Sequence, residues 1–195
     1  KEKPQLLKYG ELNYSELVII AGKLPAPKED ILEYLTQGGS LLWALDADHD
    51  SQAKSLLRNF GCQPTKSPAK DYFSGKENIS LGPKSLSETH ELSRLLSDSG
   101  VTSIKYSGIG LEMFPRSDSL QYNTLVQSLL SAPESAAATE NDVAGDQISL
   151  IATMDTRAGG RILLTGSPAL LSNSGNSRAI EVLTKWLKKE IGIIH

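Results

Sequence analysis

The first third of the chain alternates short, unbroken apolar runs with apolar residues at helical spacing. Residues 17–20 and 40–45 form two such runs, and each has the length and composition of a buried strand. Between them, residues 27–35 begin with a first-turn proline and place apolar side chains on one helical face, and Gly38 follows. We therefore predict a strand, a helix and a second strand in this order.

A second helix is predicted directly after the second strand. Asp48 or Asp50 caps its start, Gly61 ends it, and its apolar positions include Ala53, Leu56, Leu57 and Phe60. Strands that alternate with helices over short connections are typical of an α/β domain with a parallel sheet and right-handed crossovers. The pattern therefore predicts an α/β fold.

The middle of the chain has a weaker pattern. Residues 63–84 contain several Pro, Gly and Lys residues, and we predict a loop with one short strand. Residues 85–97 have the leucine spacing of a helix, and residues 101–113 contain two short strand-like pieces. Residues 131–145 are small, polar and rich in alanine, so we predict an exposed, mobile loop there.

The closing part of the chain has the clearest pattern. Two apolar runs, residues 148–153 and 161–165, flank a Gly-Gly turn at positions 159–160, and we predict adjacent antiparallel strands. A final amphipathic helix is predicted to begin at position 176 or 177 and to end at Gly192. The strand pair gives the sheet an antiparallel edge.

Composition and charge exclude several classes of protein. The chain has 195 residues, enough for a sizeable core, so we assign residues 1–195 to a single domain. Its net charge of -3 gives no footprint for nucleic acid, and no apolar run approaches the roughly 20 residues of a membrane span. The one cysteine, Cys62, excludes a disulfide within the chain, and we predict that it is a small buried apolar residue.

The sharpest chemical candidate is an acidic loop that contains Asp46, Asp48, His49 and Asp50. It follows a predicted strand, where open α/β sheets bind their ligands, and its side chains suit a divalent cation. One hypothesis is therefore a metal-dependent sugar-nucleotide enzyme that uses Asp46 and Asp48. The other is a solvated loop whose last acid caps the next helix. We favour the second, and assign no metal, cofactor or catalytic residue.

Two glycine-containing segments lie at predicted strand ends and are candidate ligand loops. In the first, a phosphate-binding fingerprint is incomplete because Met113 stands where its third glycine belongs. In the second, Pro168 breaks any nucleophile elbow, and the glycine more simply turns the chain. The residues of these two loops are Ser107, Gly108, Gly110, Gly166 and Ser167.

Two histidines and two asparagines carry weaker signals. His90, predicted inside a helix, and His195, at the last position, have no predictable Ser or Cys partner, so we expect surface residues. Asn13 and Asn78 each begin an Asn-x-Ser tripeptide, the acceptor for N-glycosylation. Two such tripeptides are weakly consistent with a secretory compartment.

An ordered set of short segments resembles one family nearly end to end. The segments are residues 6–11, 17–20, 34–40, 57–62, 106–110, 123–126, 149–152, 157–158 and 161–167, together with Tyr14, Asn176, Ala179, Trp186, Lys189, Glu190 and Gly192. Each segment alone is weak evidence for a family, whereas the whole set in this order is specific. Together they are similar to the non-catalytic DDOST (Wbp) subunit of eukaryotic oligosaccharyltransferase.

The resemblance implies a three-layer, flavodoxin-like domain, similar to class I amidotransferases, with a mostly parallel sheet and an antiparallel edge. It implies a subunit of the endoplasmic reticulum membrane, with this part in the lumen. Such a subunit supports the catalytic subunit, which transfers an oligosaccharide from dolichyl diphosphate to Asn in Asn-x-Ser/Thr. Expected partners are the other subunits and the lipid-linked oligosaccharide, with no cofactor and no catalytic residue in this chain.

The chain departs from the family pattern in several places. The family's opening strand and helix precede position 1, and its later luminal domain and membrane helix follow position 195. Membrane anchoring is therefore expected only through segments outside this chain. Residues 136–138 are alanines where relatives tend to be aromatic. A third hypothesis is a related interaction domain of intraflagellar transport or gliding motility, which shares the fold but not the partners.

Overall fold

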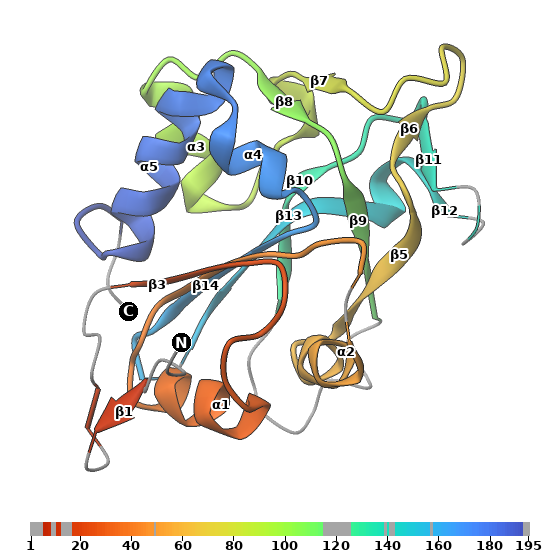
Figure 1. Cartoon of the computed structure of the whole chain (residues 1–195). Coiled ribbons are helices and arrows are strands. Elements are labelled where there is room, and N and C mark those ends of the chain that lie inside the picture. Colours follow the sequence, from red (N-terminus) through yellow and green to blue (C-terminus); the bar gives the residue numbers. More distant parts are fainter. Residues whose placement is uncertain are drawn as a thin grey trace.

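The computed structural model describes residues 6–8, 11–12, 17–48, 50–114, 126–138, 140, 143–156 and 158–192 (Figure 1). The helices are α1 (Lys28–Thr36), α2 (Ser51–Asn59), α3 (Glu91–Asp98), α4 (Pro168–Ser172) and α5 (Ser177–Leu187), with 3-10 turns η1 (Pro83–Ser85), η3 (Gly145–Gln147) and η4 (Ser174–Asn176). The strands are β1 (Leu7–Lys8), β2 (Glu11–Leu12), β3 (Val18–Ala21), β4 (Leu41–Ala44), β5 (Cys62–Pro68), β6 (Lys70–Asp71), β7 (Ile79–Leu81), β8 (Ile104–Tyr106), β9 (Ile109–Met113), β10 (Gln127–Ser131), β11 (Ala136–Ala138), β12 (Val143–Ala144), β13 (Ile148–Asp155) and β14 (Arg161–Thr165).

A seven-stranded mixed sheet forms the centre of the domain, in the order β3-β4-β14-β13-β9-β5 with β10 paired to β13. β3, β4 and β14 run parallel to one another. β13 is antiparallel to β14, as predicted, because a short turn joins them directly. The pairs β13–β9, β9–β5 and β10–β13 are also antiparallel. The fold is therefore α/β, but its antiparallel part is wider than the predicted edge.

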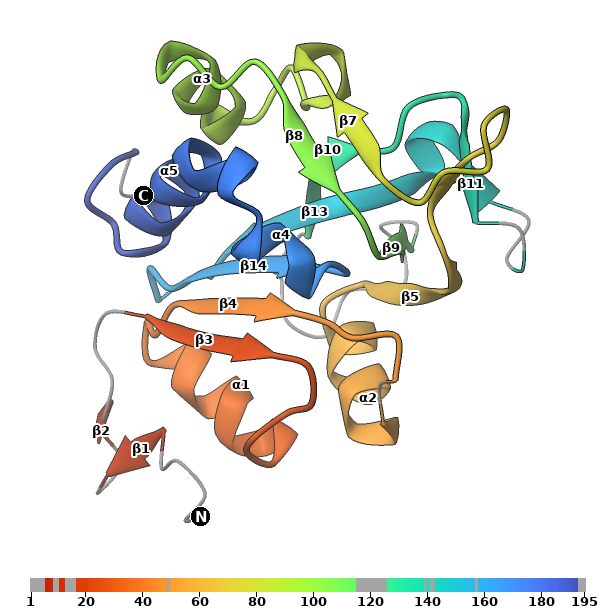
Figure 2. The same ribbon diagram turned by 45° about the horizontal axis from the view of Figure 1, so that its top comes forward.

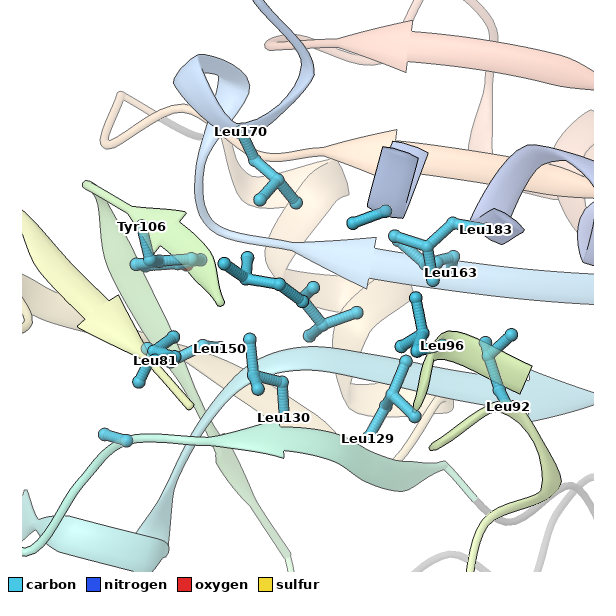
Figure 3. Packing of buried hydrophobic residues seen from close by; sticks show 14 of the residues in the cluster. Leu81, Leu92, Leu96, Tyr106, Leu129, Leu130, Leu150, Leu163, Leu170 and Leu183 are labelled. Atoms are coloured by element: carbon cyan, nitrogen blue, oxygen red, sulfur yellow. The ribbon is translucent and has the colours of Figure 1, made fainter. Parts of the chain in front are cut away.

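Helices cover both faces of this sheet, so the domain has three layers. α1 and α2 lie on one face, and α3, α4 and α5 lie on the other (Figures 1 and 2). Residues of β4 alternate between the layers, since Trp43 packs in the cluster with α1 and α2 and Leu42 in the cluster with α3–α5. Figure 3 shows the second cluster, where Leu96 of α3 and Leu183 of α5 point toward Leu163 of β14. Burial on both faces accounts for the unbroken apolar runs of β4 and β14; the flavodoxin-like arrangement stays a prediction.

The first strand-helix-strand-helix unit confirms the predicted elements. α1, β4 and α2 lie in the predicted segments, and Gly38 and Gly61 follow the two helices with left-handed φ of 87° and 79°. The prediction that β3 is a buried strand is wrong for Ile19, which is 58% exposed. β3 is the outermost strand on its side of the sheet, so only part of it is covered.

Two segments contain more strand than predicted: residues 63–84, predicted as a loop with one short strand, and residues 131–145, predicted as a loop. β5 pairs with β9 at the opposite edge of the sheet, where Thr65 and Ser67 are buried in place of the apolar residues that mark a strand. β11 lies within the predicted exposed loop, yet Ala136 and Ala138 are buried because β11 pairs with both β6 and β12. The first prediction gives too few strands and the second is wrong, because small or polar side chains are buried in these paired strands.

α3 and α5 are shorter than predicted. α3 begins at Glu91, because residues 83–85 form η1 and His90 caps the helix. α5 ends at Leu187, and Lys189 turns the chain with a positive φ of 64° before Gly192 is reached. Within the described ranges, each helix is too short or too polar to cross a membrane.

Candidate functional site

The acidic loop after β4 directs its three carboxylates to different partners. The Asp50 Oδ1 accepts a hydrogen bond from the backbone N–H of Ala53 at 2.8 Å and caps α2. The Asp48 carboxylate, which is solvent-exposed, lies 3.2 Å from the Lys23 ammonium. Asp46 accepts a hydrogen bond at 2.7 Å from the backbone N–H that follows it. The capping part of the solvated-loop hypothesis is therefore confirmed.

Metal ligands do not converge in the described part of the chain. Among those residues, no group of three or more His, Cys, Asp or Glu side chains could hold a metal ion. His49, which belongs to the acidic loop, lies outside the described residues. Cys62 is fully buried, as predicted, and burial raises the pKa of its thiol to about 12. A buried thiol with that pKa stays protonated at neutral pH and is a poor nucleophile.

The two predicted ligand loops meet in space and pack backbone against backbone, at what we call the glycine junction: Ser107, Gly108, Ile109, Gly166 and Ser167. The Ile109 N–H donates to the Gly166 carbonyl at 3.0 Å, and the Ser167 Oγ donates to the Ser107 carbonyl at 2.5 Å. A Cβ on Gly108 would lie 2.2 Å from the Gly166 carbonyl oxygen, and one on Gly166 would lie 2.0 Å from that of Ile109. Only glycine fits at these two positions.

Protein groups also occupy the space around the glycine junction. The Tyr106 hydroxyl donates to the Ile109 carbonyl, and burial raises the pKa of this phenol. The Ser167 hydroxyl accepts from the Leu170 N–H at 3.1 Å and so caps α4. Gly110 donates to the Thr65 hydroxyl at 2.8 Å. Since the Ser167 hydroxyl bonds to two backbone groups, this geometry contains no base that would activate it.

His90 is not the surface residue that the sequence predicts. Its Nδ1 accepts from the Leu92 N–H at 3.1 Å, so the neutral ring carries its proton on Nε2, which lies 2.6 Å from the Thr153 hydroxyl. Burial lowers the pKa of His90, against the opposing effect of the Asp155 and Glu91 charges. The ring caps α3 and links it to β13. His195 lies outside the described residues.

Arg161, at the start of the closing strand, ties the end of α5 to the sheet. Its buried guanidinium donates to the carbonyls of Trp186 at 2.6 Å and Ile191 at 2.9 Å. The Arg161 guanidinium carbon lies 4.7 Å from the centroid of the Trp186 ring, and Nε lies 3.3 Å from Asp155. Arg161 belongs to one of the segments that resemble the family, and these contacts give it a structural role that needs no ligand.

Of the two glycosylation tripeptides, one can be placed. Asn78 is exposed directly before β7, and Ser80 of the same tripeptide is also exposed. Asn13 lies outside the described residues.

An open groove runs beside the small sheet β12-β11-β6, and the sequence does not predict it. Its volume is about 750 Å³, and residues 84–85, 131–135 and 144–146 line it. This volume lies within the roughly 300–1,000 Å³ range of small-molecule sites. The lining includes three serines and the charged residues Lys84, Glu134 and Asp146, beside the apolar residues Ala132, Pro133 and Ala144.

Two exposed aromatic rings lie in the turn that follows β6. Tyr72 is 73% and Phe73 is 87% exposed, and their ring centroids lie 5.8 Å apart in an edge-to-face arrangement. The Tyr72 N–H donates to the carbonyl of Ser135, a groove-lining residue, at 2.6 Å. The sequence signal for this turn is an aromatic pair between Asp71 and Gly75, which hydrophobic periodicity does not detect.

The Asp71 carboxylate holds that turn. Its Oδ1 accepts from the Ser74 N–H at 2.8 Å and the Ser74 hydroxyl at 2.7 Å, and its Oδ2 accepts from the Ser135 hydroxyl at 2.8 Å. The bonds from Ser74, with a smaller contribution from Ser135, hold the pKa of Asp71 below its ordinary value. The aromatic turn is thereby fixed to the groove wall.

Comparison with known proteins identifies one family. The family model described as the N-terminal domain of OST48 matches residues 1–190, which is nearly the whole chain. No curated protein sequence matches the chain at a significant level.

Proposed function

The chain belongs to the OST48 family, and from this premise we propose that it is a docking and support domain of an oligosaccharyltransferase complex. Members of the family supply a non-catalytic subunit of that enzyme, which glycosylates asparagine side chains. The domain acts on the luminal side of the endoplasmic reticulum membrane. The observation that carries the proposal is the match of the family model over residues 1–190.

The geometry of the buried polar groups supports a role without catalysis. The hydroxyl of Ser167, the imidazole of His90 and the guanidinium of Arg161 all bond to partners within the domain. A catalytic group must instead present its reactive atom to a substrate. The domain therefore contributes binding surface rather than chemistry.

The partners are the other subunits, among them the catalytic one, and the lipid-linked oligosaccharide that this subunit uses. Anchoring to the membrane comes from segments outside residues 1–195. A net charge of -3 fits this setting, because it offers no attraction to nucleic acid.

The test is complementation of cells depleted of the endogenous subunit by the full-length protein. We expect Asp46→Ala with Asp48→Ala to restore glycosylation of a reporter fully, because neither carboxylate serves the reaction. Deletion of the domain should abolish assembly of the complex and lower glycosylation with it. Loss of transfer in the double variant, with the complex intact, would contradict a non-catalytic role.

A calorimetric titration distinguishes the enzyme alternative. Mn²⁺ with a nucleotide sugar should give no specific heat on this domain. Specific binding that Asp48→Asn abolishes would instead support a metal-dependent sugar-nucleotide enzyme.

The proposed location predicts that the exposed Asn78 carries a glycan. A luminal domain meets the glycosylation machinery, and a glycan on Asn78 would project into solvent. Asn78→Gln should lower the apparent mass of the protein in gel electrophoresis by that of one glycan. Glycosidase digestion should give the wild type the mobility of this variant.

A further inference from the structure

We propose that the aromatic turn, residues 71–76, enters the headgroup region of a phospholipid bilayer through Tyr72 and Phe73 and so orients the domain against the membrane surface. The inference rests on the proposed function, which makes the domain part of a membrane-anchored complex. It adds a direct contact between this chain and lipid, which the proposed function does not contain.

The aromatic turn projects from the body of the domain. In both views, the chain between β6 and β7 forms a loop that extends beyond the neighbouring strands, on the side opposite to β1 and β3 (Figures 1 and 2). Among the described residues, the large apolar side chains that are exposed are Tyr72, Phe73 and Ile19, and Ile19 lies apart from the other two on β3. The two rings are therefore an isolated apolar feature at a projecting point of the surface.

The aromatic turn is held in one conformation before it meets a partner. The Gly75 N–H donates to the Asp71 carbonyl at 2.7 Å, and the Asp71 N–H donates to the Lys76 carbonyl at 2.9 Å. The Asp71 carboxylate accepts three further hydrogen bonds, from Ser74 and Ser135. Gly75 supplies the left-handed φ of 64° that the turn requires. A preorganised turn loses little conformational entropy on binding.

The sequence around the aromatic turn is basic, which suits a surface of phospholipid headgroups. Residues 63–84 contain four lysines against Asp71 and Glu77, a net charge of +2, whereas the whole chain carries -3. The Asp71 carboxylate is occupied by the turn, and Glu77 pairs with Lys70 at 3.0 Å. Lys76, three residues after Phe73, is exposed. A lysine at a membrane surface is attracted to anionic lipid.

The two rings have the chemistry of side chains that lie at the boundary between water and lipid. The Phe73 ring is wholly apolar, whereas the Tyr72 ring ends in a hydroxyl that can keep hydrogen bonds in the headgroup region. The rings stand edge to face, with an interplanar angle of 88°. Because both are mostly exposed, they can enter lipid without any rearrangement of the core.

A protein partner would fit the aromatic turn less well. A stable protein interface buries about 800 Å² on each side and is depleted of charged residues at its centre. Here, two rings stand between hydrophilic residues, 70–71 before them and 74–78 after them. A bilayer needs no complementary surface, and a weak contact is enough to orient a domain that is already tethered to the membrane.

The experiment uses the whole oligosaccharyltransferase complex, purified with the full-length subunit and reconstituted in vesicles of equimolar phosphatidylcholine and phosphatidylserine. The photoreactive residue p-benzoylphenylalanine replaces Phe73, and part of the phospholipid carries an alkyne tag on its acyl chain. We expect illumination to link the subunit to tagged lipid. The same residue in place of Gln52, which is exposed on α2, should give no lipid adduct above background.

A second substitution tests the charge of the turn. Lys76→Gln, in the subunit that carries the photoreactive residue at position 73, should lower the yield of lipid adduct about fivefold, because one lysine at an anionic surface contributes a factor of this size. In vesicles of phosphatidylcholine alone, the yield should not depend on Lys76. An unchanged yield in the anionic vesicles would overturn the proposal.

The identity of the adduct decides between lipid and protein. Linkage of position 73 to another subunit in place of lipid would overturn the proposal and assign the rings to a protein interface. Absence of any adduct at position 73 in an assembled complex would overturn it as well. If the wild-type subunit itself does not co-purify with the complex, the proposed function fails, which is a different outcome from a failure of the aromatic turn.

Discussion

The glycine junction and the open groove beside β12-β11-β6 are two places where the chain could meet a ligand, and their construction is opposite. At the junction, Gly108 and Gly166 let two backbone segments touch, and Tyr106 packs beneath them. At the groove, residues 84–85, 131–135 and 144–146 leave a volume of about 750 Å³ open. One place is filled by the protein, and the other is open to solvent.

The difference teaches that glycines after a strand do not by themselves indicate a ligand loop. A glycine allows close approach, and here the group that approaches is another part of the same chain. The residues that line an accessible cavity lie elsewhere, in the open groove beside β12-β11-β6. Substitutions at the junction should therefore lower stability more than substitutions of exposed side chains elsewhere.

The largest expected effect is at the centre of the junction. Gly166→Ala places a methyl group 2.0 Å from the Ile109 carbonyl oxygen, so the backbones must separate. We expect a loss of about 3 kcal/mol in the free energy of unfolding, the upper part of the range for overpacking. Urea denaturation measures it. Gly82→Ala is the matched control, since its added Cβ meets no atom within 4 Å; equal stability of the two variants would show that the junction is loose.

A smaller loss is expected at the serine of the junction. Ser167→Ala removes the bond to the Ser107 carbonyl and the cap of α4, and we expect a loss of about 1–2 kcal/mol. Ser172→Ala, at an exposed position of the same short helix, should change the unfolding midpoint little. A Ser167→Ala variant as stable as the wild type would argue that this hydroxyl is kept for a ligand.

The next prediction concerns His90, which links α3 to β13 and should make stability depend on pH. Its folded pKa lies below the ordinary value of 6.5, so the unfolded chain binds the proton more readily. Stability from this group is complete above about pH 6.5 and is lost as the pH falls toward the lowered folded pKa. His90→Asn keeps a capping side chain without titrating, so urea midpoints should depend less on pH below 6.5 than in the wild type. An equal slope in both proteins would show that the ring is not held neutral.

The smallest effect on stability is expected at the two exposed rings of the turn after β6. Tyr72→Ala with Phe73→Ala removes two mostly exposed rings, and the free energy of unfolding should change by less than about 0.5 kcal/mol. Thermal and urea unfolding check this directly. A loss comparable to that of Gly166→Ala would remove the contrast with the junction, because the rings would then belong to the core.

The prediction from sequence succeeded where burial follows a regular period. The apolar runs of β4 and β14 and the spacing of α1 and α2 predict these elements, because strands and helices buried by the sheet repeat apolar residues at fixed intervals. The Asp50 cap and the antiparallel β13–β14 pair are likewise local in sequence. The ordered family segments also pointed to the correct family.

The sequence by itself determined the fold class, the buried runs and the family, because these depend on local pattern and on ordered motifs. Tertiary structure decided what the polar and small residues do. Thr65 and Ala136 became buried strand residues because a distant strand pairs beside them, and His90 became a cap because β13 supplies its partner. The open groove beside β12-β11-β6 likewise exists because residues near positions 84, 133 and 145 meet only after folding. Contacts between residues far apart in the chain leave no periodic pattern in its sequence.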